Sequence, residues 1–258
     1  MQKRVRWAVG VCLVLTAAAL GAPDNSWASY YRSYAEVQKY RTDKNWNWVR
    51  AELEVHNGII SSADAEAGRF IAEVLWAYTE LGSGTGEDAE WVEAGYTRGW
   101  SGGDGNPYNN DILTLYWVDR KYIESPDYRY VYQEWRITSP SIGAEDTPRV
   151  VLKWLSGSGP DADWGIYING VKKGTSHSQP HNHAHFLACG LESSASSGVL
   201  GTAADHINDM NMAKSQDGGS TIGGWQGDGL TEDVTGAYAH GHWKDGEEGY
   251  EWMNYRNW

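Results

Sequence analysis

The feature that most constrains the fold is a series of short runs rich in aromatic and β-branched residues, separated by turn-forming residues. Side chains of this kind suit the pleated, half-buried surface of a β-sheet. The runs recur at roughly ten-residue spacing with few helix signals between them, which is typical of an all-β protein. They cover residues 49–56, 69–79, 91–96, 113–122, 127–137, 150–155, 164–168 and 184–193. The pattern predicts an antiparallel β-sandwich.

Local signals refine this prediction. Asn169-Gly170 is the strongest hairpin signal in the chain. Residues 69–79 fit a strand or a short helix, and the neighbouring strands favour a strand. Residues 198–212 have the composition of a possible helix. Residues 29–45 show no clear period and are predicted to form an N-terminal arm, which leaves 46–258 as one β-sandwich domain without internal repeats.

The N-terminus has the features of a secretory signal peptide over residues 1–28. Three basic residues, Lys3, Arg4 and Arg6, precede an apolar run at 8–19. Ser26-Trp27-Ala28 offers a cleavage site after Ala28, and Gly21-Ala22 offers a second one. The apolar run is too short to span a bilayer comfortably, and no later segment approaches that length. We therefore expect a secreted, extracellular protein without a membrane partner.

Net charge excludes further partners. The whole chain carries a formal charge of −13, and removal of residues 1–28 would make it −15 because three bases and one acid are lost. Such a protein should repel nucleic acids and anionic membranes. Cys189 would be the only remaining cysteine, so no internal disulfide is expected. We expect a monomer. The apolar surroundings of Cys189 favour a buried, inert thiol over a nucleophile.

Aromatic composition is unusual, with 15 Trp and 16 Tyr but only two Phe. Trp and Tyr combine an apolar body with a polar tip, so they suit a sheet face that lines a wet groove. The alternative is that they replace Leu and Ile in the core. We expect both uses within the chain.

Histidines cluster in the sequence TSHSQPHNHAH at 175–185. On a strand, His181, His183 and His185 would share one face, an arrangement that suits Zn or Cu. Pro180 and Asn182 instead favour a solvated loop, and spacing fixes no acidic partner. We therefore predict no metal and no cofactor. The motifs HExxH and GxSxG and the phosphate-binding Gly loop are absent from the chain.

Two glutamates stand inside predicted strands. Glu93 lies in WVEAGY and Glu192 lies in ACGLES. An unpaired carboxylate is costly to bury, so such a residue either faces solvent from an amphipathic strand or serves a function. Residues 127–137 place Tyr130, Tyr132 and Glu134 on one face and Trp135 on the other.

A resemblance connects these segments to a family. WVEAGY followed by LYWVDRKY resembles the "IEAGW … YWT.D.Y" pattern of the neprosin family of glutamic peptidases. GLESSASSGVLGTAADHINDM resembles the segment around that family's second glutamate. More distantly, the chain is similar to eqolisin-type fungal glutamic peptidases, whose first motif reads "LQ.G" and whose "YEWYP" resembles YVYQEWRI. The similarity covers residues 70 to 212, although the cysteines of the plant proteins are missing.

The resemblance implies a jelly-roll or concanavalin-like sandwich with a concave groove that holds a catalytic pair, Glu93 and Glu192. Such a pair shares one proton, because two like charges held close together cannot both ionise. It implies hydrolysis of polypeptides at acidic pH, with an expected preference for sites next to proline. We assign Glu192 as the base and Glu93 as the acid, and the sequence leaves the reverse assignment open. The candidate groove residues, each with core packing as its alternative, are Trp91, Tyr96, Tyr116, Trp117 and Glu134.

Two other functions stay open. An aromatic concave face also suits a non-catalytic module that binds an extracellular glycan by stacking Trp and Tyr on sugar rings. A glycoside hydrolase could use the same two carboxylates. Fold alone does not separate these functions.

Overall fold

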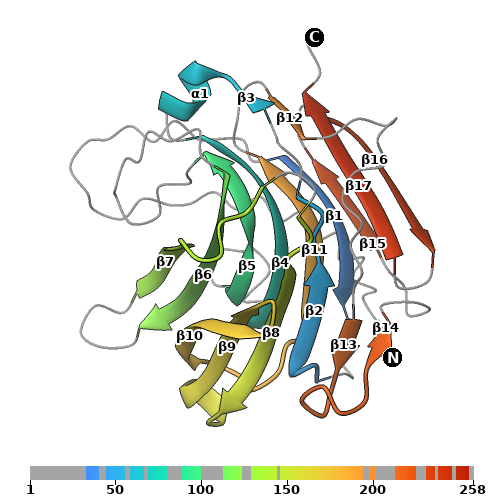
Figure 1. Ribbon diagram of the computed structural model, residues 1–258. Helices are drawn as coiled ribbons and strands as arrows, with labels where there is room; N and C mark the ends of the chain where they lie inside the picture. Colours follow the sequence, from blue (N-terminus) through green and yellow to red (C-terminus); the bar gives the residue numbers. More distant parts are fainter. Residues whose placement is uncertain are drawn as a thin grey trace, which may run out of the picture.

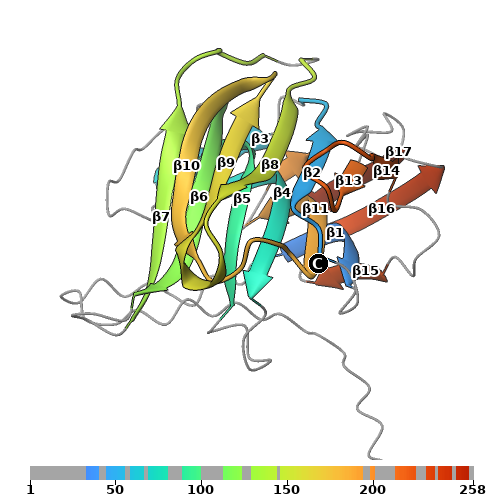
Figure 2. The same cartoon turned by 90° about the horizontal axis from the view of Figure 1, so that it is seen from below.

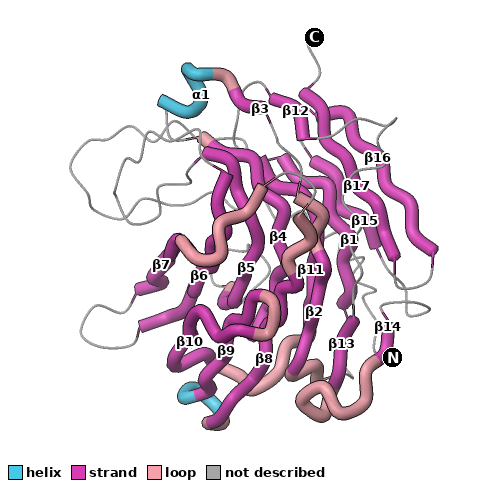
Figure 3. The backbone as a smooth tube through the Cα atoms, in the orientation of Figure 1, coloured by secondary structure: helices cyan, strands magenta, loops and turns pink. Residues whose placement is uncertain are grey.

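The computed structural model describes residues 33–40, 45–55, 59–66, 69–80, 89–99, 113–123, 129–143, 146–193, 198–200, 213–224, 231–235, 238–245 and 248–255. Most of this is β-structure, with one short helix, α1 (Ser62–Glu66), one 3₁₀ turn, η1 (Gly159–Asp161), and connecting loops (Figure 3). The prediction of an all-β, antiparallel fold is confirmed, because every strand pair within the described residues is antiparallel.

The largest sheet has seven strands in the order β15-β1-β11-β4-β5-β6-β7. Their bounds are β15 (Thr231–Thr235), β1 (Ser33–Tyr40), β11 (Phe186–Ser193), β4 (Phe70–Glu80), β5 (Glu90–Gly99), β6 (Leu113–Ile123) and β7 (Arg129–Ile137). The runs at 69–79 and 91–96 are therefore strands, as predicted. The expectation of an N-terminal arm at 29–45 is wrong for residues 33–40. These residues form β1, which lies within the sheet between β11 and β15.

A six-stranded sheet, in the order β10-β9-β8-β2-β13-β14, packs in front of the seven-stranded sheet in Figure 1. Its strands are β10 (Val171–Gln179), β9 (Ala162–Ile168), β8 (Arg149–Ser156), β2 (Trp48–Glu52), β13 (Ala213–Ser215) and β14 (Gly223–Gly224). The turn between β9 and β10 is Asn169-Gly170, with φ of 51° and 79°. Positive φ at both positions fits a hairpin turn of the Asn-Gly type and confirms that signal.

A four-stranded sheet, β16-β17-β12-β3, lies on the side of the molecule where β1 and β15 lie (Figures 1 and 2). It consists of β16 (Tyr238–Asp245), β17 (Glu248–Tyr255), β12 (Gly198–Leu200) and β3 (Ile59–Ile60). Strand β12 occupies the start of the segment with the composition of a possible helix, and residues 201–212 lie outside the described residues.

The hydrophobic core lies between the two larger sheets. One group of buried residues combines Leu75, Ala94 and Leu115 of the seven-stranded sheet with Leu152 and Ile166 of the six-stranded sheet. A second group is drawn from the seven-stranded sheet alone, including Trp76, Trp91 and Tyr116, and it covers the opposite face. Strands β4 and β5 are therefore buried on both faces, and each large apolar side chain buried there contributes about 1.5–3 kcal/mol.

A buried polar network ties β10 to the seven-stranded sheet. Gln179 Nε2 donates to Asp119 Oδ1 at 3.1 Å, and Thr79 Oγ1 donates to Gln179 Oε1 at 2.5 Å. Lys121 Nζ reaches both Asp119 Oδ2, at 3.0 Å, and the carbonyl oxygen of His177, at 2.7 Å. Burial raises the pKa of Asp119, and Lys121 opposes that rise. These contacts hold β10 beside β6, as Figures 1 and 2 show.

Gly95, in the middle of WVEAGY, is required by close strand packing. A Cβ added at this residue would collide with the backbone carbonyl of Glu73 on β4. Gly95→Ala should therefore lower the free energy of unfolding by roughly 3 kcal/mol or more, since neither backbone can move without breaking the β4–β5 ladder.

The measurement is urea unfolding followed by tryptophan fluorescence. Gly143→Ala is the matched control, because a Cβ there would meet only Asp146 Oδ2 at 3.9 Å. A Gly95→Ala protein as stable as the Gly143→Ala protein would show that β4 and β5 are not packed this closely.

Candidate active site

Three buried carboxylates share one face of the seven-stranded sheet, the face directed away from the six-stranded sheet; we call it the carboxylate face. Residues paired directly across neighbouring strands point to the same side. Glu93 on β5 pairs with Val118 on β6, which pairs with Glu134 on β7. Glu93 also pairs with Trp76, a member of the aromatic group on this face. Glu93 and Glu134 therefore lie in one row across the sheet.

Glu192 joins the same face from β11. It pairs with Ala72 on β4, and Ala72 pairs with Thr97 on β5. Glu192 is thus level with Thr97, which is two strands away and four residues along β5 from Glu93. In a flat sheet this offset corresponds to ~16 Å between the Cα atoms of Glu93 and Glu192, whereas Glu93 and Glu134 would be ~10 Å apart. The predicted pair, Glu93 and Glu192, therefore does share a face. The two residues lie in different rows, with the row that contains Gly95 between them.

Tyr116 stands in that central row. It pairs with Gly95 on β5, which pairs with Val74 on β4, and Val74 pairs with Gly190 on β11. Val74 on β4 lies midway between the two glutamates, whereas Tyr116 on β6 is one strand beyond Glu93. Burial and the negative charges of Glu93 and Glu192 hold the pKa of Tyr116 well above its usual range. The phenol therefore remains protonated and has a proton that it can donate to an acceptor.

Glu93 is held by two tryptophans. Trp76 Nε1 on β4 and Trp91 Nε1 on β5 both donate to Glu93 Oε2, each at 2.7 Å. The side chain of Glu93 is 3% exposed, so these donors offset part of the cost of burying a carboxylate. Trp91 was expected to line a groove; it instead orients Glu93. Trp76 was not predicted, because its place beside Glu93 depends on strand register, which sequence alone does not fix.

Glu134 and Glu192 are also buried, at 4% and 2% exposure. The hydroxyl of Tyr132 donates to Glu134 Oε2 at 3.3 Å. Tyr132 also packs edge-on against Trp91, with ring centroids 6.5 Å apart. The third carboxylate is thereby linked through one aromatic side chain to the tryptophan that holds Glu93.

Two predicted groove residues lie on the wrong face. Tyr96 packs in the core between the sheets, and its hydroxyl donates to the carbonyl oxygen of Glu54 at 3.1 Å. Trp117 belongs to the same core and stacks on Trp135, with ring centroids 3.9 Å apart. Each is an odd number of residues from a member of the carboxylate face on its own strand, so strand alternation turns it away. Core packing, the stated alternative, holds for both.

The histidine cluster lies in the connection between β10 and β11 and is half-buried. His183 Nε2 is 3.0 Å from His185 Nε2, and His183 Nδ1 donates to Asn182 Oδ1 at 2.9 Å. His181 Nε2 lies 3.0 Å from Glu80 Oε2 at the end of β4. The expected solvated loop is thus a packed group of imidazoles. Within the described residues, no three or more His, Cys, Asp or Glu side chains are arranged to hold a metal ion.

Burial, together with the neighbouring His185 and His181, lowers the pKa of His183 from 6.5 to about 4. The folded protein therefore favours the neutral imidazole. The resulting contribution to stability is complete above about pH 6.5 and is lost as the pH falls towards 4. His183→Gln should weaken the fall in unfolding free energy between pH 6.5 and 4.

Urea unfolding at several pH values, with NMR titration of the histidines, measures this effect. His177→Gln is the control, because that imidazole is exposed and pairs with Asp163 outside the cluster. A titration midpoint of His183 near 6.5, or the same pH dependence of stability in the His183→Gln protein, would contradict the expectation.

Cys189 is fully buried in the core, as the sequence predicted. Native protein should accordingly react with an alkylating reagent only at the rate at which β11 opens, far more slowly than denatured protein. Mass spectrometry of the modified chain over time gives this rate. Labelling of native and denatured protein at similar rates would show that the thiol is accessible.

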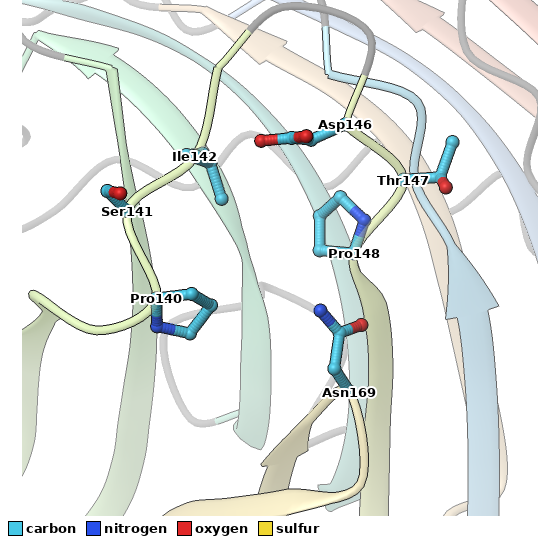
Figure 4. A pocket seen from close by; sticks show the side chains of 7 residues that line it. All are labelled: Pro140, Ser141, Ile142, Asp146, Thr147, Pro148 and Asn169. Carbon is cyan, nitrogen blue, oxygen red and sulfur yellow. The ribbon is translucent and has the colours of Figure 1, made fainter.

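A shallow surface hollow lies away from the carboxylates (Figure 4). It is lined by the connection between β7 and β8, including Pro140, Ile142 and Asp146, and by Asn169 in the β9–β10 turn. In Figure 4, Pro140 and Ile142 stand across from Asp146 and Asn169. None of the residues of the carboxylate face lines it, so we do not connect it with the candidate active site. No helix among the described residues is long and apolar enough to cross a membrane.

Comparison with family models and with curated proteins finds no match. The resemblance to the neprosin family therefore stays a prediction. Several solved structures are similar to the chain. One is Scytalido-glutamic peptidase with a peptide-based transition state analogue, at 9% identity and a TM-score of 0.45, covering 86% of this chain and 98% of that chain.

A second similar structure is SCP-B, a member of the eqolisin family of peptidases, in complex with the tripeptide Ala-Ile-His. It has 8% identity and a TM-score of 0.42, covering 87% of this chain and 98% of that chain. A third is a β-glucanase of Bacillus licheniformis, at 12% identity and a TM-score of 0.35, covering 86% of this chain and 71% of that chain. Peptidases and carbohydrate-active enzymes both occur among these structures, and similarity at this level does not assign a chemistry.

Proposed function

We propose that the chain is a secreted hydrolase of the glutamic-peptidase type, which cleaves polypeptides at acidic pH through Glu93 and Glu192. The observation that carries this proposal is the presence of two buried glutamates on one sheet face, with the phenol of Tyr116 within reach of the charge of both. Buried carboxylates gathered around one hydroxyl group are costly to fold, and acid–base chemistry gives such a group a function.

In the proposed reaction, ionised Glu192 takes a proton from a water molecule, and the water oxygen forms a bond to the peptide carbonyl carbon. Protonated Glu93 donates its proton towards the carbonyl oxygen, which becomes a hydroxyl of the tetrahedral intermediate. The C–N bond then breaks as the nitrogen takes the proton from Glu192, and a hydroxyl proton returns to Glu93. The products are a carboxylic acid and an amine, and no metal or cofactor takes part.

The alternative function, glycan binding, has less support because the aromatic side chains on this face are buried. Trp76, Trp91, Tyr116 and Phe186 are all nearly inaccessible to solvent, whereas sugar-stacking platforms present their rings. The two functions are separated by measuring hydrolysis of a denatured protein and, in parallel, binding of soluble polysaccharides.

Substitution of the glutamates tests the assignment. Glu192→Gln should lower kcat by roughly 10²–10⁴-fold, because an amide cannot accept the proton of water. Glu93→Gln should be milder, because an amide still donates a hydrogen bond to the carbonyl oxygen. Hydrolysis of a denatured protein between about pH 3 and 7, the range in which such a pair would work, is the measurement.

Glu52→Gln is the control, since Glu52 lies in the other sheet and pairs with exposed Arg149. Glu134→Gln tests the pairing itself, because Glu134 is nearer to Glu93 in the strand register. A collapse of activity in Glu134→Gln with full activity in Glu192→Gln would make Glu134 the partner of Glu93. Intact polysaccharide binding without any peptide hydrolysis would overturn the proposed function.

A further inference from the structure

We propose that Trp76 and Trp91 are positioning residues that determine which oxygen of Glu93 carries its proton. The inference concerns the role assigned to Glu93 and so rests on the proposed function. It is carried by the two indole N–H groups that converge on the same carboxylate oxygen, Oε2, at equal distances of 2.7 Å.

A carboxylate oxygen has two lone pairs in the plane of the group, and two N–H donors occupy both. Oε2 is therefore always an acceptor, and any proton on Glu93 resides on Oε1. The indoles thus fix both the rotamer of Glu93 and the oxygen through which it exchanges a proton with substrate. Without them the carboxyl group would rotate between two equivalent arrangements, and only one would present the proton correctly.

The clamp formed by Trp76, Trp91 and Glu93 is itself held on several sides. The guanidinium of Arg120 lies over the Trp91 ring, 4.7 Å from its centroid, and its Nη1 donates to the carbonyl oxygen of Ala89 at 3.0 Å. Tyr78 packs against Trp91, with ring centroids 5.6 Å apart. Trp91 therefore has a cation on its ring face and an acceptor oxygen of Glu93 at its N–H, and both contacts favour the observed orientation.

Strand geometry explains why these two tryptophans meet Glu93. Trp91 precedes Glu93 by two residues on β5 and so shares its face, while Trp76 is the directly paired residue on β4. Both indoles are nearly inaccessible to solvent, as Glu93 is, so their N–H groups meet the carboxylate without competition from bulk water. Trp164 offers a matched comparison, because its buried indole donates to the carbonyl oxygen of His181, at 3.0 Å, in the other sheet.

The first test needs no enzymatic activity. In ¹⁵N-labelled protein, the indole N–H signals of Trp76 and Trp91 should shift together with pH, with one common midpoint set by Glu93. Glu93→Gln should abolish this titration in both signals and leave the Trp164 signal where it was. Signals that do not respond to Glu93→Gln, or that still titrate together after it, would overturn the clamp.

The second test is kinetic. Trp76→Phe and Trp91→Phe should each lower kcat by about tenfold with little change in KM, because a hydrogen bond to a charged group is lost while apolar packing is kept. The alkaline limb of the pH–rate profile should move to higher pH, since ionised Glu93 loses a donor. Trp164→Phe should leave kcat, KM and the profile unchanged.

The outcomes separate the two proposals. A change confined to KM in the tryptophan variants would overturn the positioning role and make the indoles substrate contacts. An intact paired titration in a chain that hydrolyses no peptide would support the clamp and refute the peptidase function. If Trp76→Phe and Trp91→Phe keep the kcat and the pH–rate profile of the unchanged protein, the clamp is refuted and the proposed peptidase function is not.

Discussion

Strands β4 and β5 are buried on both faces, and this constraint governs much of the rest of the structure. A strand in that position cannot satisfy a polar side chain with bulk water, so each such group needs a partner within the protein. Thr79 meets this need through Gln179, Thr97 through the carbonyl oxygen of Ile71, and Glu93 through Trp76 and Trp91. The two strands thus combine apolar packing with internal hydrogen bonds that each require a particular register.

The site follows from the same constraint. The β4–β5 register brings Trp76 to Glu93, and Gly95 allows the close strand contact on which that register depends. Tyr116 stands in the same row as Gly95, Val74 and Gly190, two positions of which carry no side chain. A shift of one residue would turn Glu93 into the core between the sheets and replace it with an apolar neighbour. Fold stability and the arrangement of the carboxylates therefore depend on one pairing.

Strand positions and the β9–β10 turn could be predicted from the sequence, because they depend on local chemistry such as alternation and the φ preferences of Asn169 and Gly170. Alternation also separated Tyr132 and Glu134 from Trp135 correctly. The same alternation could have excluded Tyr96 and Trp117 from the groove, since each is an odd number of residues from a member of the carboxylate face on its strand and so points to the opposite face. Strand β1 was missed because its pairing with β11 and β15 is long-range and leaves no periodic pattern. The pairing of Trp76 with Glu93 depends on register in the same way.

The choice of tryptophan over phenylalanine has a physical explanation in these contacts. Trp164 donates to the carbonyl oxygen of His181, Trp154 to those of Ser156 and Gly157, and Trp76 and Trp91 to Glu93. The buried indoles of Trp76, Trp91 and Trp164 fill apolar space as phenylalanine would and also supply a donor to a buried or half-buried acceptor, whereas half-buried Trp154 donates to carbonyls of exposed residues. A phenylalanine core of the same volume would leave Glu93 without these donors and would favour its replacement by an apolar residue. The aromatic composition and the buried carboxylate are consequently two aspects of one arrangement.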